Sequence, residues 1–517
     1  MIKKIARLPL IYKMEIFLFL GVTILYFFLR LKNLTILPIF ADEAIYIRWS
    51  QVMKAESTLR FLPLSDGKQP LFMWLLMPVF SFFNDPLFAG RFLSVMAGFG
   101  TLLGIFLLSL GLFRSRVVAL LSCLIYALVP FAVFFDRMAL VDSLLTMFGV
   151  WILFLGVLLV RYQRIDLAMV TGLVLGGALL TKSPAMFFAF LLPVAAILLP
   201  TKSRRNLLAS LLKLVGLWLI VYIFAFGAYN ILRLGPNFHM IAARNLDYVF
   251  SFREILAHPL DPFRPHIGQV WEWFLVFLGW PLIIAFFGGI IFGARKWPRQ
   301  TILLLSWFFL PLLAQMAIAK VFTARYIFFM IPFLLIFGAI FLNQLIGRIT
   351  KLRFTAKGQI VVAIVVLVLF LLPSFRFDCL LFTDPQKLPL PEGERTGYLE
   401  QWTSGYGINE VRDYLKQVSQ KQHVNVGTEG YFGTLPDGLQ IYFDKDPKVT
   451  VFGVGLALSL VPESLKESAA SGEALTYLVV NESRMGAKND PSLELILKIP
   501  KAKGEKGQDS LLLYQVK

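Results

Sequence analysis

The feature that most constrains this chain is a series of apolar blocks that fills most of residues 15–377. Each block is about 20 residues long, and at about 1.5 Å per helical residue this length spans the roughly 30 Å hydrocarbon core of a bilayer. Hydrophobic residues make up 57% of the whole chain, whereas soluble domains contain about 45–50%. The blocks therefore predict a polytopic α-helical membrane protein.

About eleven blocks are candidate membrane spans. They cover residues 15–31, 87–112, 117–135, 140–160, 167–182, 184–200, 207–232, 268–293, 301–319, 325–346 and 358–377. No small-residue cleavage site follows the first block, so we expect a retained signal-anchor helix. Between the first two spans, residues 43–55 predict an amphipathic helix and residues 70–83 a short interfacial or re-entrant helix.

The distribution of basic residues predicts the orientation of the spans. The net charge is +18, but the basic residues fall in short loops between apolar blocks, which favours a role in membrane orientation over nucleic-acid binding. If eleven spans alternate, these loops share one side, which the positive-inside rule assigns to the cytoplasm. The basic residues of that side are Lys3, Lys4, Arg7, Lys13, Arg114, Arg116, Arg161, Arg164, Lys202, Arg204, Arg205, Arg295, Lys296, Arg299, Arg348, Lys351, Arg353 and Lys357.

The same alternation places the loops 32–86 and 233–267 and everything after residue 377 on the extracytoplasmic side. We therefore expect a multi-pass protein of a plasma (inner) membrane, with a cytoplasmic N-terminus. Cys123 and Cys379 are too few for a disulfide framework, and we expect both to be unpaired.

The composition changes after residue 377, where the predicted membrane domain (1–377) ends. Residues 378–395 are rich in proline and charge and predict a linker. Residues 396–517 alternate between helical and strand patterns, which predicts a small extracytoplasmic α/β domain with a mixed or parallel sheet. We expect helices at 408–418, 435–443 and 462–470, and strands at 423–430, 448–454, 475–480, 493–499 and 511–516.

Acidic residues occur at two places on the predicted extracytoplasmic side. Asp42 and Glu43 follow the first span. They fit a helix start, with Asp42 as N-cap, and equally a general base that meets a substrate at the membrane face. Asp136, Arg137 and Asp142 join the third and fourth spans. A local salt bridge and a helix cap would explain them, although an arginine there could also bind phosphate.

Cations occur on the same predicted side. Lys68 precedes an apolar run, Lys182 lies in the turn between the fifth and sixth spans, and Arg325 with Tyr326 begins a later span. Each also has a bland explanation, because lysine can extend toward water and Arg and Tyr are common at membrane interfaces. Together, however, several cations suit a lipid-linked phosphate, and a carboxylate suits deprotonation of a nucleophile.

At these residues the chain resembles the GT-C superfamily of membrane glycosyltransferases, and in particular the protein O-mannosyltransferases and the lipid A aminoarabinose transferases. The resemblance rests on five elements in order: ADEAIYIRWSQ (41–51), Lys68 to Trp74, Arg137 to Asp142, Thr181 to Pro184, and Arg325-Tyr326. It covers roughly residues 10–345. It implies an inverting transfer of a sugar from a polyprenyl-phosphate donor to a protein hydroxyl, glycan or glycolipid.

The resemblance also implies roles for individual residues. Asp42 would be the catalytic base, and Lys68, Lys182, Arg325 and Tyr326 would bind the donor phosphate, whose departure needs charge neutralisation. The residues expected to bind the acceptor are Glu43, Asp136, Arg137 and Asp142.

Three positions depart from the family pattern. Gln69 replaces a proline and Ser183 replaces a glycine. Gly67 stands where the lipid A transferases carry an acid that binds metal in some proposals, so we predict no metal cofactor.

Two other classes of function are compatible with many spans. A lipid or sugar transporter or flippase would show inverted repeats and helices broken near mid-membrane. Here the charges concentrate at one face and no repeat is visible, which favours the enzyme. A receptor would need far fewer spans to anchor the α/β domain.

Overall fold

The computed structural model describes residues 10–199, 204–257, 260–349, 355–456, 458–486, 490–505 and 507–517. The chain divides into two units, each assembled from distant segments. Unit 1 comprises residues 1–32, 61–72 and 94–383, and unit 2 comprises residues 33–60, 73–93 and 384–517. Of the basic residues predicted to be cytoplasmic, Lys3, Lys4, Arg7, Lys202, Lys351 and Arg353 lie outside the described residues.

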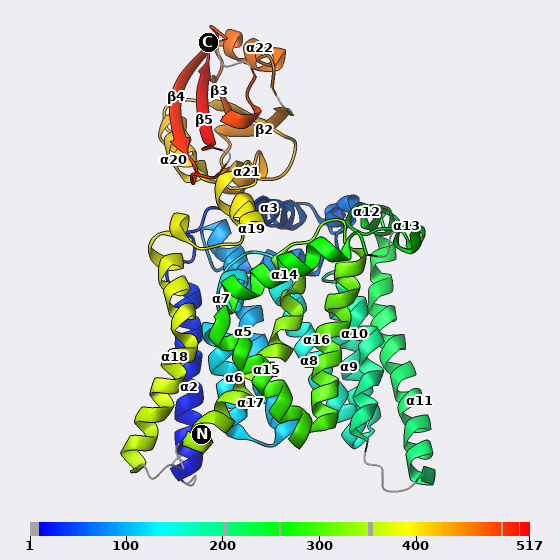
Figure 1. The fold of residues 1–517 in the computed structure, drawn as a ribbon. Coiled ribbons are helices and arrows are strands. Elements are labelled where there is room, and N and C mark those ends of the chain that lie inside the picture. Colours follow the sequence, from blue (N-terminus) through cyan, green and yellow to red (C-terminus); the bar gives the residue numbers. More distant parts are fainter. Residues whose placement is uncertain are drawn as a thin grey trace. The chain divides into compact units, whose positions relative to one another are not determined.

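Unit 1 is a bundle of helices that run side by side (Figure 1). Its long helices are α2 (Leu10–Leu31), α5 (Pro86–Phe113, which begins in unit 2), α6 (Arg116–Leu128), α8 (Val141–Tyr162), α9 (Ile165–Leu179), α11 (Arg204–Tyr229), α14 (Phe263–Phe277), α15 (Gly279–Lys296), α16 (Pro298–Ile318), α17 (Ile331–Ile349) and α18 (Ala356–Thr383). Shorter elements connect them: η2 (Leu62–Asp66), α7 (Pro130–Asp136), η3 (Ser183–Ala185), α10 (Met186–Leu191), η4 (Leu192–Leu198), η5 (Asn230–Leu234), α12 (Met240–Tyr248), α13 (Phe252–Ala257) and η6 (Ala324–Met330).

The predicted class of a polytopic helical membrane protein is confirmed. Among the described residues, seven helices are long and apolar enough to cross a membrane, and two bent helix pairs bring the number to as many as nine. Two shorter apolar helices, Ile165–Leu179 and Ser183–Leu198, correspond to the fifth and sixth predicted blocks. The number of spans stays a prediction, because these last two are short.

Two of the predicted blocks are sharply bent. Helices α6 and α7 meet at 60°, where Pro130 begins the second helix. Helices α14 and α15 meet at 108°, at Gly279. The backbone of Gly279 has a φ of +76°, a conformation that residues with a side chain rarely adopt, and this allows the reversal. The final helix α18 is longer than predicted and continues through Asp378 to Thr383.

The loops of unit 1 separate into two groups at opposite ends of the bundle (Figure 1). At one end, backbone hydrogen bonds join Phe250 to Ile318 and Lys320 to Tyr248, so two loops predicted to share a side do lie together. At the other end, Arg161 donates to the Gly111 carbonyl and Arg299 to that of Leu199. Which end faces the cytoplasm stays a prediction.

Unit 2 contains the predicted α/β domain, and each predicted helix and strand is found. The helices are α20 (Ile408–Ser419), α21 (Asp437–Phe443) and α22 (Glu463–Ser471), and the strands are β1 (Val424–Glu429), β2 (Val449–Gly455), β3 (Leu475–Asn481), β4 (Leu493–Pro500) and β5 (Ser510–Val516). The sheet order is β2-β1-β3-β5-β4. Strand β1 pairs in parallel with β2 and β3, whereas β5 is antiparallel to β3 and β4, so the sheet is mixed.

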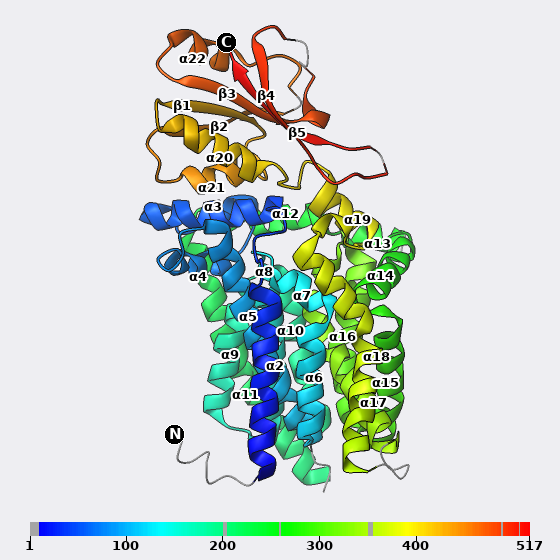
Figure 2. The same ribbon diagram turned by 90° about the vertical axis from the view of Figure 1, so that its left-hand side faces the viewer.

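The sheet of unit 2 is covered on both faces (Figure 2). Side chains alternate along β3, so Leu478 and Val480 pack with Leu465 of α22, while Tyr477 contacts Tyr414 of α20 on the other face. Unit 2 also contains α3 (Ala41–Ala55), α4 (Leu71–Val79), η1 (Ser57–Leu59), η7 (Pro385–Lys387), α19 (Glu392–Arg395), η8 (Thr396–Glu400) and η9 (Glu482–Arg484). Cys123 and Cys379 are both free thiols, as predicted.

Candidate functional site

In unit 1, Lys182 lies on the turn that the sequence predicts. Helix α9 ends at Leu179, and Pro184 lies in the following 3-10 turn, where the residue has no backbone N–H to lose. The Lys182 Nζ donates to Oδ1 of Asp142 at 2.7 Å. Asp142 is in the first turn of α8, where the helix dipole favours a carboxylate, and is 3% exposed. The predicted phosphate ligand therefore has an acidic partner from another helix.

Lys182 and Arg325 both lie over the ring of Tyr326. The Lys182 Nζ lies 4.3 Å from the centroid of the Tyr326 ring, and the Arg325 Cζ lies 5.4 Å from the same centroid. The electron-rich face of an aromatic ring attracts both charges. Two cations from different segments therefore lie against one aromatic ring, which concentrates positive charge in this part of unit 1.

Lys68 follows a tight turn that is built against α12. The 3-10 helix η2 ends at Gly67, whose φ of +67° is left-handed. A Cβ at Gly67 would lie 2.7 Å from the Arg244 Cβ and 2.7 Å from the Met240 carbonyl oxygen. Only glycine fits there. Asp66 then pairs with two cations, through Oδ1 with Arg244 at 2.8 Å and through Oδ2 with Lys68 at 3.4 Å.

The two lysine elements of unit 1 are hydrogen-bonded to each other. The Gln69 Nε2 donates to the Ser183 Oγ at 2.9 Å, and the Leu71 N–H donates to the Leu180 carbonyl at 3.1 Å. Gln69 and Ser183, two of the departures from the family pattern, therefore bond to each other. Lys68 and Lys182 consequently belong to neighbouring turns at one end of unit 1.

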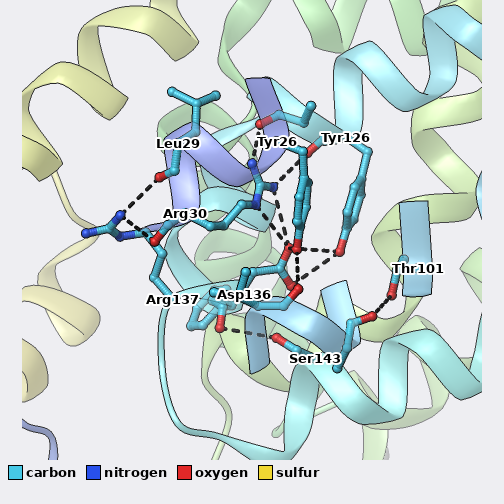
Figure 3. Close-up of polar contacts among 12 residues, drawn as sticks. Tyr26, Leu29, Arg30, Thr101, Tyr126, Asp136, Arg137 and Ser143 are labelled. Carbon is cyan, nitrogen blue, oxygen red and sulfur yellow. Dashed lines mark hydrogen bonds and ion pairs between the residues drawn. The ribbon is translucent and has the colours of Figure 1, made fainter. Parts of the chain in front are cut away.

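Asp136 lies at the centre of a buried polar network (Figure 3). Its Oδ2 accepts hydrogen bonds from Tyr126 Oη at 3.0 Å, Tyr26 Oη at 3.3 Å and Arg30 Nε at 3.4 Å. Arg30 and Asp136 are both 0% exposed. Asp136 was predicted to bind the acceptor, but these partners occupy the carboxylate and exclude solvent. Its position favours a role in holding α2, α6 and α7 together.

Arg137 points to the end of α2 (Figure 3). Its Nη1 donates to the carbonyl oxygens of Leu29, Arg30 and Lys32 at 3.0, 2.9 and 2.8 Å. The last carbonyls of a helix have no partner within the helix and carry a partial negative charge, so a guanidinium is a suitable cap. Arg137 is 4% exposed, and its geometry again favours structural support over contact with the acceptor.

In unit 2, Glu43 forms a buried ion pair with Arg91. The Arg91 Nε and Nη2 each lie 2.8 Å from a different oxygen of Glu43, and both side chains are 0% exposed. The Phe40 N–H also donates to Glu43 Oε2 at 2.9 Å. Helix α3 has Phe40 as its N-cap, so the expectation that Asp42 is the N-cap is wrong. Asp42 instead lies half-buried in the first turn, one residue before the paired Glu43.

The start of α3 is attached to the C-terminal part of unit 2. The Ala41 N–H donates to the Thr403 carbonyl at 3.0 Å, and the Gly405 N–H donates to the Ile39 carbonyl at 2.8 Å. Further along α3, the Gln51 side chain donates to the Ile441 carbonyl at 2.8 Å. The helix that carries Asp42 is therefore fixed by the α/β domain, whose role the sequence left open.

Comparison with known proteins agrees with this architecture. Residues 67–229 match the family model of dolichyl-phosphate-mannose-protein mannosyltransferases. The structure is similar to that of ArnT from Cupriavidus metallidurans bound to undecaprenyl phosphate, with a TM-score of 0.59, 15% identity and coverage of 97% of each chain. The chain has the GT-C fold.

A second similar structure is that of an oligosaccharyltransferase. The archaeal oligosaccharyltransferase AglB from Archaeoglobus fulgidus, solved with an inhibitory peptide and a dolichol-phosphate, aligns with a TM-score of 0.52 and 10% identity. The alignment covers 92% of this chain and 70% of AglB. A comparison of sequences with curated proteins finds no match. The resemblance to GT-C enzymes seen in the sequence is thus confirmed at the level of the fold.

Several residues of this site were not identified from the sequence, because they lie outside the motifs. Arg91 pairs with Glu43 of the first motif, and Arg30 and Arg244 pair with Asp136 and Asp66, which lie just before two other motifs. Arg30 and Arg91 could have been noticed, because a charge at the end of, or inside, an apolar block is costly and usually has a partner. Among the described residues, no group of three or more His, Cys, Asp or Glu side chains could hold a metal ion.

Proposed function

We propose that this protein is an inverting glycosyltransferase that moves a sugar from a polyprenyl phosphate to an acceptor on the extracytoplasmic side of a plasma membrane. The observation that carries the proposal is the cation cluster of unit 1, in which Lys182 and Arg325 lie on the ring of Tyr326. The fold supports it, since the similar ArnT structure has undecaprenyl phosphate bound.

The donor side of the proposed reaction uses Lys68, Lys182, Arg325 and Tyr326. The leaving group is a lipid phosphate that gains negative charge as its bond to the sugar breaks. Preorganised cations stabilise such a charge strongly where water is scarce. All four residues are only partly exposed, which lowers the local dielectric constant without sealing them from a ligand.

The acceptor side of the proposed reaction uses Asp42. An acceptor hydroxyl attacks the anomeric carbon from the face opposite the phosphate, and Asp42 takes the hydroxyl proton. The bond between the anomeric carbon and the phosphate oxygen breaks, and the electron pair leaves with the polyprenyl phosphate. A base must be held in place to act in this way. The Glu43–Arg91 pair and the bonds from Thr403 and Ile39 hold the turn that carries Asp42.

The other predicted acceptor ligands change role in this proposal. Glu43 holds the turn that carries Asp42 in unit 2, whereas in unit 1 Asp136 and Arg137 support α2 and Asp142 orients Lys182. The acceptor therefore meets Asp42 and surfaces that the motifs do not identify. A protein hydroxyl, a glycan and a glycolipid all remain candidate acceptors.

The proposal is tested by replacing Asp42 with Asn in cells that otherwise lack the protein. We expect sugar transfer to fall by about a hundredfold or more, because a general base contributes about 10²–10⁴ to the rate. The measurement is mass spectrometry of glycolipids and glycoproteins from cells with the wild-type protein, the variant or neither. The purified variant should unfold at the wild-type temperature.

The matched control is Asp166→Asn, which removes an exposed carboxylate from the first turn of α9. It should retain most of its transfer activity. Equal glycan profiles in cells with and without the wild-type protein would refute the glycosyltransferase. Full activity of Asp42→Asn would remove Asp42 from the mechanism while leaving the rest of the proposal to the donor-binding experiments below.

A further inference from the structure

We propose that Arg244 is a positioning residue for the donor site: by making the closer contact with Asp66, it weakens the hold of that carboxylate on Lys68. This inference rests on the proposed function of Lys68 as a ligand of the donor phosphate. Arg244 lies on α12, in a loop region where no family motif drew attention to it. Its contribution would be to keep the Lys68 ammonium available for an incoming anion.

The geometry of Asp66 is the basis of the inference. The carboxylate is shared unequally, because Arg244 lies 2.8 Å from Oδ1 whereas Lys68 lies 3.4 Å from Oδ2. Arg244 also lies 2.6 Å from Asp247 through its other terminal nitrogen. The guanidinium is thus held from two sides in a fixed orientation, as its planar, multi-donor shape allows. Asp66 directs its shorter contact to Arg244 and its longer contact to Lys68.

Charge explains why this sharing matters. Asp66 precedes Lys68 by two residues, so an anionic ligand of Lys68 must approach a carboxylate. Arg244 offsets that negative charge locally. Coulomb energies at partly exposed sites are moderate but significant at such distances. Without Arg244, Asp66 would close on Lys68 and would repel the phosphate, and both effects would weaken donor binding.

The backbone turn that joins Asp66 to Lys68 packs closely on Arg244. Gly67 lies between Asp66 and Lys68, and its missing side chain allows the turn to pack directly on the Cβ of Arg244. The pKa of Arg244 is raised, with the charge of Asp66 as the largest cause. The neighbouring Asn245 lies 3.5 Å from the Ser183 Oγ. One turn of α12 therefore contacts both lysine elements of the proposed donor site.

The experiment measures equilibrium binding of undecaprenyl phosphate to the purified full-length protein in detergent, with undecaprenol as the uncharged control lipid. Arg244→Gln should weaken binding of the phosphate lipid by roughly three- to tenfold. The double variant Asp66→Asn with Arg244→Gln should recover wild-type affinity, because it removes the carboxylate whose hold on Lys68 Arg244 weakens. Arg244→Lys should retain much of the affinity, since it keeps a cation for Asp66.

The outcomes separate the possible roles of Arg244. If Arg244 touched the phosphate itself, the double variant would stay weak, and that result would overturn the proposal. Equal affinity of Arg244→Gln and wild type would also overturn it. If the role of Arg244 were purely structural, Arg244→Gln and the double variant would both unfold at a lower temperature than the wild type. The Asp66→Asn substitution would then not restore binding.

Arg253→Gln is the matched control, because it removes one positive charge from the exposed surface of the adjacent α13. It should bind like the wild type, and an equal loss there would show that only net charge matters. Failure of the wild-type protein to prefer undecaprenyl phosphate over undecaprenol would refute the proposed donor, and with it the proposed function. A wild-type preference that Arg244→Gln does not change would refute only the inference about Arg244.

Discussion

The polar network around Asp136 and the cation cluster around Tyr326 both lie in unit 1, yet they differ in how deeply their charges are buried. Arg30 and Asp136 are 0% exposed, and each has several hydrogen-bond partners. In the other cluster, the side chain of Lys182 is 21% exposed. Lys182 bonds to Asp142, and Arg325 lies against the same aromatic ring as Lys182.

The difference teaches how to separate supporting charges from charges that meet a ligand. A buried pair that is fully bonded resists change, because removing one partner leaves an isolated charge in a medium of low dielectric constant. A partly exposed cation costs the fold little and can exchange its partner for a ligand. In unit 2 the same difference in burial separates Glu43, which is buried and paired with Arg91, from the half-buried Asp42 beside it.

The strongest way to break the comparison is Arg30→Met. We expect a loss of about 3–5 kcal/mol of stability, since the substitution leaves Asp136 buried without its cation. The purified protein should show a much lower unfolding temperature and a lower folded yield in detergent. The double variant with Asp136→Leu should recover most of the stability. A single variant as stable as the wild type would show that the network is not a support.

Lys68→Met tests the proposed donor site, where charges are partly exposed. Asp66 keeps its closer partner Arg244, so the unfolding temperature should change little. Affinity for undecaprenyl phosphate should fall about tenfold or more, because a bond from a charged group to phosphate contributes roughly 1.5–3 kcal/mol. Unchanged affinity, measured in the same binding assay, would remove Lys68 from the donor site.

Lys501 in unit 2 extends the comparison to a buried lysine that stabilises the fold. Its Nζ donates to the carbonyls of Gln401 and Ser404, both at 2.9 Å. Burial lowers the pKa of Lys501 to about 8. The folded state therefore releases its proton before the unfolded state does, so stability should rise as the pH increases from about 8 toward the ordinary lysine range.

The measurement for Lys501 is the unfolding temperature as a function of pH, for the wild type and for Lys501→Met. The difference between the two proteins isolates the contribution of this lysine from that of other groups. We expect the wild type to gain on the variant as the pH rises from 8 to about 10. A constant difference over this range would mean that Lys501 keeps its proton in both states. This is the smallest of the expected effects.

Much of the fold could be predicted from the sequence, because it depends on local periodicity. Apolar blocks of membrane-spanning length located the helices of unit 1, and short apolar runs located strands such as β3 and β5. The bends at Pro130 and Gly279 were harder to predict, since proline and glycine permit a bend without requiring it. The grouping of α3 with residues 384–517 depends on contacts that no local pattern encodes.

The sequence predicted which residues of the candidate site come together better than it predicted what each residue does. The motifs of Lys182 and Tyr326 do meet, as the resemblance implies. Burial could not be predicted: Asp136 and Arg137 were expected to bind the acceptor, and the structure shows them buried, with partners in α2, in α6 and at Lys32. Arg30 is 106 residues away from Asp136 in the sequence, and such a pairing is visible only once the chain is folded.

The attachment of α3 has a consequence for the synthesis of the protein. Gln51 bonds to the backbone of Ile441, 390 positions downstream, and Ala41 bonds to that of Thr403. A ribosome therefore delivers the helix that carries Asp42 long before it delivers the segment that fastens it. A nascent chain that still lacks that segment has its apolar helices but holds Asp42 only loosely, so under the proposed mechanism activity begins only after residues 403–441 have been synthesised.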